Sequence, residues 1–302
     1  MEYSKFKNDI EFKTYLKNNK LRIKDYFEKE SPKFDLLTGE KIRFKDRKSY
    51  LITDFSNKRN LVNWLKAQSE KDRFDYLTKK ILERKRDKQL TYFPSQVELR
   101  SIKQIPTLNH LIEMVNYNKL CGATSLKPRY DYTKTFNFRQ IQSDLIILRD
   151  TREQTPLRFP KFKIIESKLD YGDYTAASDW FDSIYIERKS LQDLIGTMSK
   201  GFERFCREII RAESMGAYIV VLVEDGFKDF ESFEYTRQGR YTNCSYEYIA
   251  HQIKKIMQSY GNIQFVFAGS KDKSADLLIK FLKAGKNIKQ LDLQYLVDIK
   301  CL

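Results

Sequence analysis

The chain has 302 residues, of which 41% are hydrophobic, and a formal net charge of +15 at pH 7. This composition is that of a globular protein with a sizeable core, and it excludes disordered and collagen-like chains. No apolar run approaches the roughly 18–20 residues that cross a bilayer. The first twenty residues are charged throughout and lack the apolar stretch of a secretory signal. We therefore expect no membrane partner.

Cysteine and histidine usage narrows the classes of site. The four cysteines are scattered, without a pair separated by two residues, which argues against a zinc site or a disulfide framework. This pattern favours a reducing, intracellular setting, either the cytoplasm of a bacterium or phage-infected cell or a eukaryotic nucleus. With only two histidines in the chain, a mechanism that needs a histidine cluster is excluded.

Positive charge is concentrated in the first part of the chain. Residues 1–140 hold 32 Lys and Arg against 18 Asp and Glu, whereas the remaining 162 residues hold 24 against 23. A basic module next to a nearly neutral one indicates a polyanionic partner, most commonly nucleic acid. The alternative is a lysine-rich surface that reflects only an AT-biased genome. We expect two domains, 1–140 and 141–302, with the first as a basic DNA-binding module.

The basic module is expected to be α+β or mostly helical. Residues 41–45 alternate basic and apolar side chains, which predicts a half-buried strand with a basic outer face. Apolar residues at helical spacing predict helices over about 57–69 and 71–89, the second with a basic face. Either surface could lie along phosphates or simply face solvent. The candidate DNA contacts in this module are Lys41, Arg43, Lys45, Lys80 and Arg84.

Two further helix starts are predicted at Pro94-Ser95 and Pro106-Thr107, because proline fits the first turn and a hydroxyl side chain caps it. The stretch 93–130 resembles the short helical repeats that accompany some phage and intron homing endonucleases. The matching points are Pro94, Glu98-Leu99, Pro106 and Leu126-x-Pro128-Arg129. Residues 131–143 are polar and without periodicity, which indicates a linker.

From residue 144 the pattern changes to strands that alternate with helices. Short apolar runs predict strands at 144–150, 162–169, 173–178, 183–189, 217–225 and 262–269. Helices are expected over 190–215, 246–260 and 274–286, and a loop of about 20 residues follows 225. This arrangement predicts an α/β domain with a largely parallel central sheet.

Acidic residues gather where these strands end or begin. Asp150 and Glu153 follow the first strand, Asp173 opens the third, and Glu187 and Lys189 close the fourth. Strand ends at one edge of a sheet bring such side chains together. Magnesium prefers oxygen ligands, usually one or two carboxylates with water and phosphate oxygens. Residues two apart in a strand share a face, so the lysine can sit beside the acid and the attacking water.

One segment, GDYTAASDWFDSIYIERKSLQD, resembles the signature of the XPF nuclease family, Gly-Asp-x(n)-Glu-Arg-Lys-x-x-x-Asp. Upstream, LRDTRE resembles the acidic segment of that family, with Asp150, Arg152 and Glu153, and GFERFCREI resembles its Arg-Phe helix. The resemblance covers about residues 144–286. The signature positions are Gly172, Asp173, Glu187, Arg188, Lys189 and Asp193.

This resemblance implies the restriction-endonuclease-like PD-(D/E)xK fold and a Mg²⁺-dependent endonuclease, in which Mn²⁺ can substitute. It implies that Asp173 and Glu187 bind the metal, that Asp150 joins them as a ligand and that Glu153 belongs to the same acidic cluster. Lys189 would position the nucleophile, and Arg188 would hold the site or the phosphate. Asp193 would support Lys189 or Arg188.

The resemblance also implies DNA as the partner, and a homodimer or heterodimer through the nuclease domain. Branched, flapped or otherwise structured DNA is the expected substrate. The alternatives are a sequence-directed phage or homing-type endonuclease, if residues 93–130 read bases, and a catalytically silent DNA-binding recombination factor. A helical stripe of Lys200, Arg204, Arg207 and Arg211 could contact the DNA backbone near the cut or face solvent.

Overall fold

The computed structural model describes residues 14–15, 17–20, 58–134, 138, 144–177, 181–235 and 244–302. The strand expected at 41–45, with Lys41, Arg43 and Lys45, lies outside these residues. In the described part of the chain, no helix is both long and apolar enough to span a membrane. The chain divides into two compact units. We call Met1–Gln89 with Ile102–Ser125 the helical unit, and Leu90–Ser101 with Leu126–Leu302 the sheet unit.

Four helices of the helical unit bury a leucine-rich interior. They are α4 (Lys58–Ala67), α5 (Glu70–Lys88), α7 (Leu108–Met114) and α8 (Tyr117–Thr124). Helix α5 begins where the Ser69 side chain accepts a hydrogen bond from the Asp72 amide, which satisfies a donor that the first turn leaves unpaired. The helices expected at 57–69 and 71–89 are confirmed within two residues at each end.

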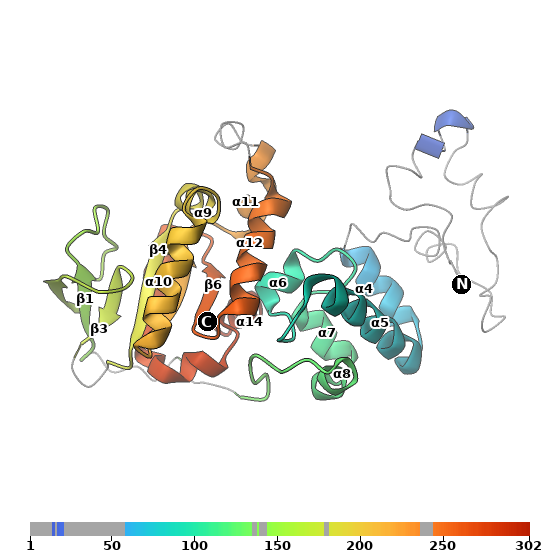
Figure 1. Ribbon diagram of the computed structural model, residues 1–302, viewed down its shortest axis with the longest axis horizontal. Helices are drawn as coiled ribbons and strands as arrows, with labels where there is room; N and C mark the ends of the chain where they lie inside the picture. The colour runs from blue at the N-terminus through green and yellow to red at the C-terminus, as the bar shows by residue number, and fades with distance from the viewer. Residues whose placement is uncertain are drawn as a thin grey trace. The chain divides into compact units, whose positions relative to one another are not determined.

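The sheet unit is organised around a six-stranded sheet of order β2-β1-β3-β4-β5-β6 (Figure 1). Strand β3 runs antiparallel to both β1 and β4, and the other neighbouring pairs are parallel. The expectation of a largely parallel sheet is therefore corrected to a mixed one. The strands are β1 (Ile146–Asp150), β2 (Lys163–Ser167), β3 (Tyr174–Ala176), β4 (Ile184–Lys189), β5 (Tyr218–Val223) and β6 (Ile263–Phe267).

Helices cover both faces of this sheet, so its central strands are buried on two sides. Helices α9 (Leu191–Met198), α10 (Phe202–Ser214), α11 (Phe227–Ser232) and α12 (Tyr246–Ser259) pack on one face. The other face carries α13 (Lys271–Ala284), the 3-10 helix η4 (Gly285–Gln290) and α14 (Leu293–Asp298). All six residues of β5 are buried, which explains its continuous aliphatic sequence, because each face contributes its own core.

The loop expected after residue 225 contains α11 and the 3-10 helix η2 (Phe233–Tyr235). Neither helix was predicted, since both are short. Phe230 and Phe233 stack at 6.1 Å between ring centroids, and Phe230 also stacks on Phe267 of β6 at 5.1 Å. This aromatic packing fixes the segment against the sheet without a long helical repeat that a sequence pattern could reveal.

A short segment before residue 102 belongs to the sheet unit and not to the helical unit. Helix α6 (Gln96–Arg100) starts with a capping box between Ser95 and Glu98, and the Glu98 side chain also accepts a hydrogen bond from Gln258 at 2.7 Å. Val97 belongs to the core on the face of the sheet that α9–α12 cover. The predicted helix start at Ser95 is thus observed, and its helix packs on the sheet unit.

Arg129 ties the next part of the chain to the same core. Its guanidinium donates to the backbone carbonyls of Met257, Tyr260 and Ile263, the latter two at 3.0 and 2.7 Å. It therefore caps the end of α12 and the start of β6 with one planar group. Charged donors to buried carbonyls are among the stronger hydrogen bonds.

We expect Arg129→Ala to lower the free energy of unfolding by about 2–4 kcal/mol, because three carbonyls lose their donor. Thermal denaturation of the full chain measures this change. The control is Lys228→Ala, an exposed position on α11, which should shift stability by less than about 0.5 kcal/mol. Equal melting temperatures for both variants would contradict the structural role of Arg129.

Candidate active site

The acidic residues meet at one edge of the sheet because the hydrogen-bond ladder continues past the strand ends. The Asp150 amide donates to the Asp173 carbonyl, and the Asp173 amide donates to the Ile186 carbonyl, both at 2.8 Å. On the other side, the Glu224 amide donates to the Lys189 carbonyl at 2.9 Å. Since β3 is antiparallel, its beginning lies at the same edge as the ends of β1, β4 and β5. The predicted convergence is observed, and β3 and β4, which carry Asp173 at the beginning of one and Glu187 in the other, pair antiparallel.

Gly172 sets the close approach of the Asp173 segment to β4. Its φ is +58°, in the left-handed region that favours glycine. A Cβ at this position would lie 2.8 Å from the backbone oxygen of Ile186. Any side chain here would push Asp173 away from β4, so the geometry accounts for a glycine before the acid.

Asp173 is the acid most strongly influenced by its surroundings. Its Oδ2 accepts a hydrogen bond from the Arg188 amide at 2.7 Å. Burial, and next the negative charge of Glu187, raises the pKa of Asp173 to about 7. The two carboxylates therefore repel each other at close range when no cation lies between them.

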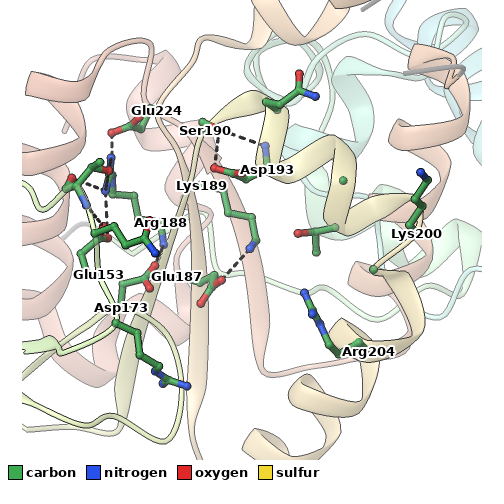
Figure 2. Close-up of a pocket in the computed structure, with 17 residues that line it drawn as sticks. Glu153, Asp173, Glu187, Arg188, Lys189, Ser190, Asp193, Lys200, Arg204 and Glu224 are labelled. Atoms are coloured by element: carbon green, nitrogen blue, oxygen red, sulfur yellow. Dashed lines mark hydrogen bonds and ion pairs between the residues drawn. The ribbon is translucent and has the colours of Figure 1, made fainter. Parts of the chain in front are cut away.

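Glu187 and Lys189 point to the face of the sheet that α9 and α10 cover, because they are two residues apart in β4. Lys189 Nζ donates to Glu187 Oε1 at 2.8 Å, and the ammonium also lies 5.6 Å from the ring centroid of Phe205 on α10. Figure 2 shows this amino group directed at the Glu187 carboxylate. The lysine is thus held in place next to the acids.

Arg188 points to the opposite face and is fully engaged by protein groups. Its Nε donates to Glu224 at 2.8 Å, and its Nη1 lies 3.0 Å from Glu153 Oε2. The same Nη1 donates to the Thr155 carbonyl at 2.8 Å. The side chains of Arg188 and Glu153 are each 9% exposed, so Arg188 joins the end of β4 to the segments after β1 and β5. Of its two expected roles, holding the site together is the one this geometry favours.

Asp150 is directed away from the pocket. Its carboxylate accepts hydrogen bonds from the Arg152 amide, the Arg152 guanidinium and the Leu169 amide at 2.7–2.9 Å. The hydrogen bond from Arg152 is the main reason that the pKa of Asp150 is lowered to about 2. Both oxygens are therefore occupied, and Asp150 is not among the residues that line the pocket. The geometry gives it a positioning role and not the role of a third metal ligand.

Asp193 caps helix α9. Its Oδ2 accepts a hydrogen bond from Ser190 Oγ at 2.6 Å, while Ser190 Oγ accepts from the Asp193 amide. The contact expected with Lys189 or Arg188 is replaced by this capping pair. Asp193 still lines the pocket, and by fixing the start of α9 it sets the position of the helix that faces Glu187 and Lys189.

These side chains surround an open pocket of about 920 Å³. Lys200 and Arg204 lie across it from Glu187 and Lys189, with the Arg204 guanidinium directed toward them (Figure 2). Arg207 and Arg211 do not line it, and Arg211 instead donates to the Asp170 carbonyl at 3.2 Å. Of the basic stripe expected from the sequence, two residues therefore line the pocket and two lie outside it. The lining is Arg152, Glu153, Gln154, Thr155, Asp173, Glu187, Arg188, Lys189, Ser190, Gln192, Asp193, Gly196, Thr197, Lys200, Gly201, Arg204 and Glu224.

The remaining candidate DNA contacts, Lys80 and Arg84, lie on α5 of the helical unit. Lys80 Nζ pairs with Glu83 at 2.9 Å and its side chain is 22% exposed. The sequence shows a basic helix face there, but the structure shows that part of its charge is neutralised locally.

The donor set suits a hard divalent cation. Within the described residues, no three Asp, Glu, His or Cys side chains gather closely enough to hold a metal ion by themselves. Asp173 and Glu187 provide two carboxylates whose negative charges repel each other, and this repulsion contributes to the raised pKa of Asp173. Magnesium commonly takes one or two carboxylates and completes its shell with water and phosphate oxygens, so these residues fit the ion implied by the sequence.

Sequence reasoning missed Glu224 and Thr155, which complete the contacts of Arg188. A signal for Glu224 existed, because it follows β5, whose end lies beside the end of β4. Thr155 carried no signal, since it lies in a loop and its shortest contact with Arg188 is through its backbone carbonyl.

The family model of the ERCC4 domain matches residues 138–281. No curated protein matches the chain at a significant level of sequence similarity. Among solved structures, the chain is similar to XPF from Aeropyrum pernix in complex with DNA, at 22% identity and a TM-score of 0.34, over 47% of this chain and 65% of that chain. A second structure of XPF from Aeropyrum pernix matches at 21% identity and a TM-score of 0.32, over 45% and 64%.

The matched part thus spans less than two thirds of either XPF chain. Every residue that lines the pocket, from Arg152 to Glu224, falls inside the segment matched by the ERCC4 domain model. The six-stranded sheet with helices on both faces is the architecture expected for this nuclease fold. Residues 138–281 thus match the model of the ERCC4 domain, which covers just under half of the chain.

Proposed function

We propose that this protein is a metal-dependent endonuclease that hydrolyses phosphodiester bonds in DNA. The observation that carries the proposal is the grouping of Asp173, Glu187 and Lys189 at one sheet edge, inside an open pocket. Two carboxylates and an ammonium group form the set that metal-assisted phosphodiester hydrolysis needs. A surface ion pair would not require an acid whose pKa is raised to about 7 by burial and a neighbouring carboxylate.

A divalent cation, Mg²⁺ or Mn²⁺, would activate water and neutralise charge on the phosphate when bound. Asp173 and Glu187 would hold it through their carboxylate oxygens. Lys189 would keep the attacking water in line, because its amino group has three N–H donors and only one of them is used by Glu187. Arg188, Glu153 and Glu224 would keep the strand ends in register while the phosphate is bound.

The family assignment of residues 138–281 supports DNA as the substrate. The excess of Lys and Arg in residues 1–140 supports an additional, sequence-independent attraction to phosphates. The substrate we propose is branched, flapped or otherwise structured DNA. We also propose that the protein forms a dimer through its nuclease domain.

A cleavage panel tests this function. The protein is incubated with Mg²⁺, Mn²⁺ or EDTA and with one labelled substrate at a time: duplex, flap, fork, four-way junction, single-stranded DNA or RNA. Separately, light scattering measures the mass of the protein in solution and so its oligomeric state. We expect cleavage of flap, fork or junction DNA with either cation and none with EDTA. Cleavage of one duplex sequence would indicate a sequence-directed enzyme, and binding without cleavage would refute the catalytic proposal.

A further inference from the structure

The pocket wall opposite the acids is formed by the second half of α9 and the beginning of α10. Gly196, Thr197, Lys200, Gly201 and Arg204 all line it. In Figure 2, Lys200 and Arg204 stand across the pocket from Asp173 and Glu187. None of these wall residues takes part in holding the acids, so the wall needs another explanation.

Cations in the pocket fall into two groups. Arg152 pairs with Asp150 at 2.7 Å, Arg188 pairs with Glu153 and Glu224, and Lys189 pairs with Glu187. These three are occupied by protein carboxylates.

Lys200 and Arg204 form the second group. Among the described residues, the Lys200 side chain makes no ion pair or hydrogen bond. Arg204 lies 3.9 Å from Glu208, with 75% of its own side chain exposed, an arrangement that contributes little. Two positive charges on the pocket wall are therefore available to an anion.

At Gly196, no side chain projects from this wall into the pocket. It lies inside α9, where glycine is less stable than alanine. Its φ is not positive, and a Cβ added there would meet nothing within 4 Å. Neither the backbone nor the packing therefore requires glycine at this position. Its missing side chain leaves the helix surface open to a ligand that lies in the pocket.

Gly201 has a different function in this wall. A Cβ on Gly201 would lie 3.1 Å from Thr197 Cα, so a larger residue would widen the turn between α9 and α10. The tight turn brings Lys200 and Arg204 to the same side as Gly196. The wall thus combines an open helix surface with two available cations.

We propose that this wall binds the phosphodiester backbone of the substrate strand next to the bond that is cut. Lys200 and Arg204 contact a neighbouring phosphate, and Gly196 lets the strand lie against α9. This inference rests on the proposed nuclease function and adds the residues that position the strand. A pocket of about 920 Å³ holds a ligand of several hundred daltons, which corresponds to a few nucleotides.

The first experiment compares charge variants of the full chain. Binding of a fluorescent flap duplex is measured by anisotropy in Ca²⁺ over a range of salt concentrations, and cleavage is measured in Mg²⁺. We expect Lys200→Ala to weaken binding about 5–10-fold and to reduce the slope of log K against log salt by about 0.7–0.9, the value for one lost phosphate contact. Lys228→Ala, an exposed cation outside the pocket, should change affinity less than two-fold.

The second experiment separates ligand contact from fold stability. Gly196→Ala should raise the melting temperature by about 1–3 °C, because alanine favours the helix, and yet raise KM at least five-fold. Gly261→Ala is the matched control, since its Cβ would also meet nothing within 4 Å and its φ is not positive. It should leave KM unchanged.

Three outcomes separate the two proposals. Wild-type affinity and KM in Lys200→Ala and Gly196→Ala, with cleavage intact, would overturn the strand-binding wall and leave the nuclease proposal standing. An equal loss in Arg207→Ala would show that α10 attracts DNA along its whole length, which would also overturn it. Failure of the wild-type protein to cleave would refute the nuclease proposal.

Discussion

Replacing Asp173 with asparagine is expected to abolish metal-dependent cleavage and, without divalent cations, to stabilise the protein above neutral pH. Asparagine keeps the acceptor for the Arg188 amide but removes one of the two carboxylates that we assign to the metal. It also removes the repulsion between Asp173 and Glu187, which contributes to the raised pKa of Asp173. A variant that loses function and gains stability is the sign of a site built for a ligand.

The pH dependence follows from the pKa of Asp173, which is about 7 in the folded protein against an ordinary value of 3.8. The folded state binds the proton more tightly than the unfolded state. The contribution of this group to stability is therefore lost as pH rises from about 4 to about 7, and it stays lost above that range. Three pKa units correspond to at most about 4 kcal/mol, and water in the pocket reduces this to about 2–3 kcal/mol.

Thermal denaturation in EDTA at pH 5 and pH 8 measures the effect. We expect Asp173→Asn to melt several degrees above the wild type at pH 8 and by a smaller margin at pH 5. Addition of Mg²⁺ should raise the melting temperature of the wild type at pH 8 and leave that of the variant unchanged, because only the wild type gains a ligand. A variant less stable than the wild type at both pH values would refute the proposed repulsion.

Removal of the Arg188 side chain should have the largest effect on stability. Arg188→Ala leaves Glu153 and Glu224 without their partner, and these side chains are 9% and 17% exposed. Removing one member of a buried ionic network costs about 3–5 kcal/mol, because the remaining charges stay desolvated. The segments after β1 and β5 would separate from the end of β4, so we also expect cleavage to fall by at least about a hundred-fold.

Urea denaturation with Lys280→Ala as the control measures this prediction. Lys280 pairs with Asp276, which is 62% exposed, so the control should cost less than about 1 kcal/mol. The double variant Arg188→Met with Glu224→Gln should recover part of the stability but not the activity. If Arg188→Ala were no less stable than the control, the ionic network would not hold the strand ends together.

The strand segments and the grouping of the acids at strand ends could be predicted from the sequence, because both depend on local patterns. The Glu187-x-Lys189 pair follows from the two-residue repeat of a strand, and Gly172 before Asp173 follows from a tight turn. The antiparallel pairing of β3 with β1 was not predicted, since β3 has only three residues. Its acid nonetheless reaches the same edge.

What a side chain contacts was less predictable than where it lies. Asp150 stands at the right strand end, yet its carboxylate is satisfied by Arg152 and Leu169. Glu224 is 36 residues from Arg188 in the chain, and its side chain accepts a hydrogen bond from Arg188. The pairing of β4 with β5 brings the two residues together. Such contacts depend on the rotation of each side chain at a crowded sheet edge, which a one-dimensional pattern does not contain.

The division of the chain was also only partly predictable. We expected a boundary near residue 140, from charge and composition. In the structure, one unit is formed by Leu90–Ser101 and Leu126–Leu302. Glu98 accepts a hydrogen bond from Gln258 of α12, and Arg129 donates one to the Tyr260 carbonyl at the end of α12. The charge and composition of a 140-residue segment do not reveal contacts made by single residues of this kind.

Binding of Mn²⁺, followed by electron paramagnetic resonance, tests the central claim most directly. If Asp173 and Glu187 share a divalent cation, the wild-type protein will bind Mn²⁺, and both Asp173→Asn and Glu187→Gln will lose that binding. Asp276→Asn, which removes an exposed acid on α13, will keep it. Equal Mn²⁺ binding by all four proteins would show that these two carboxylates are not the metal site.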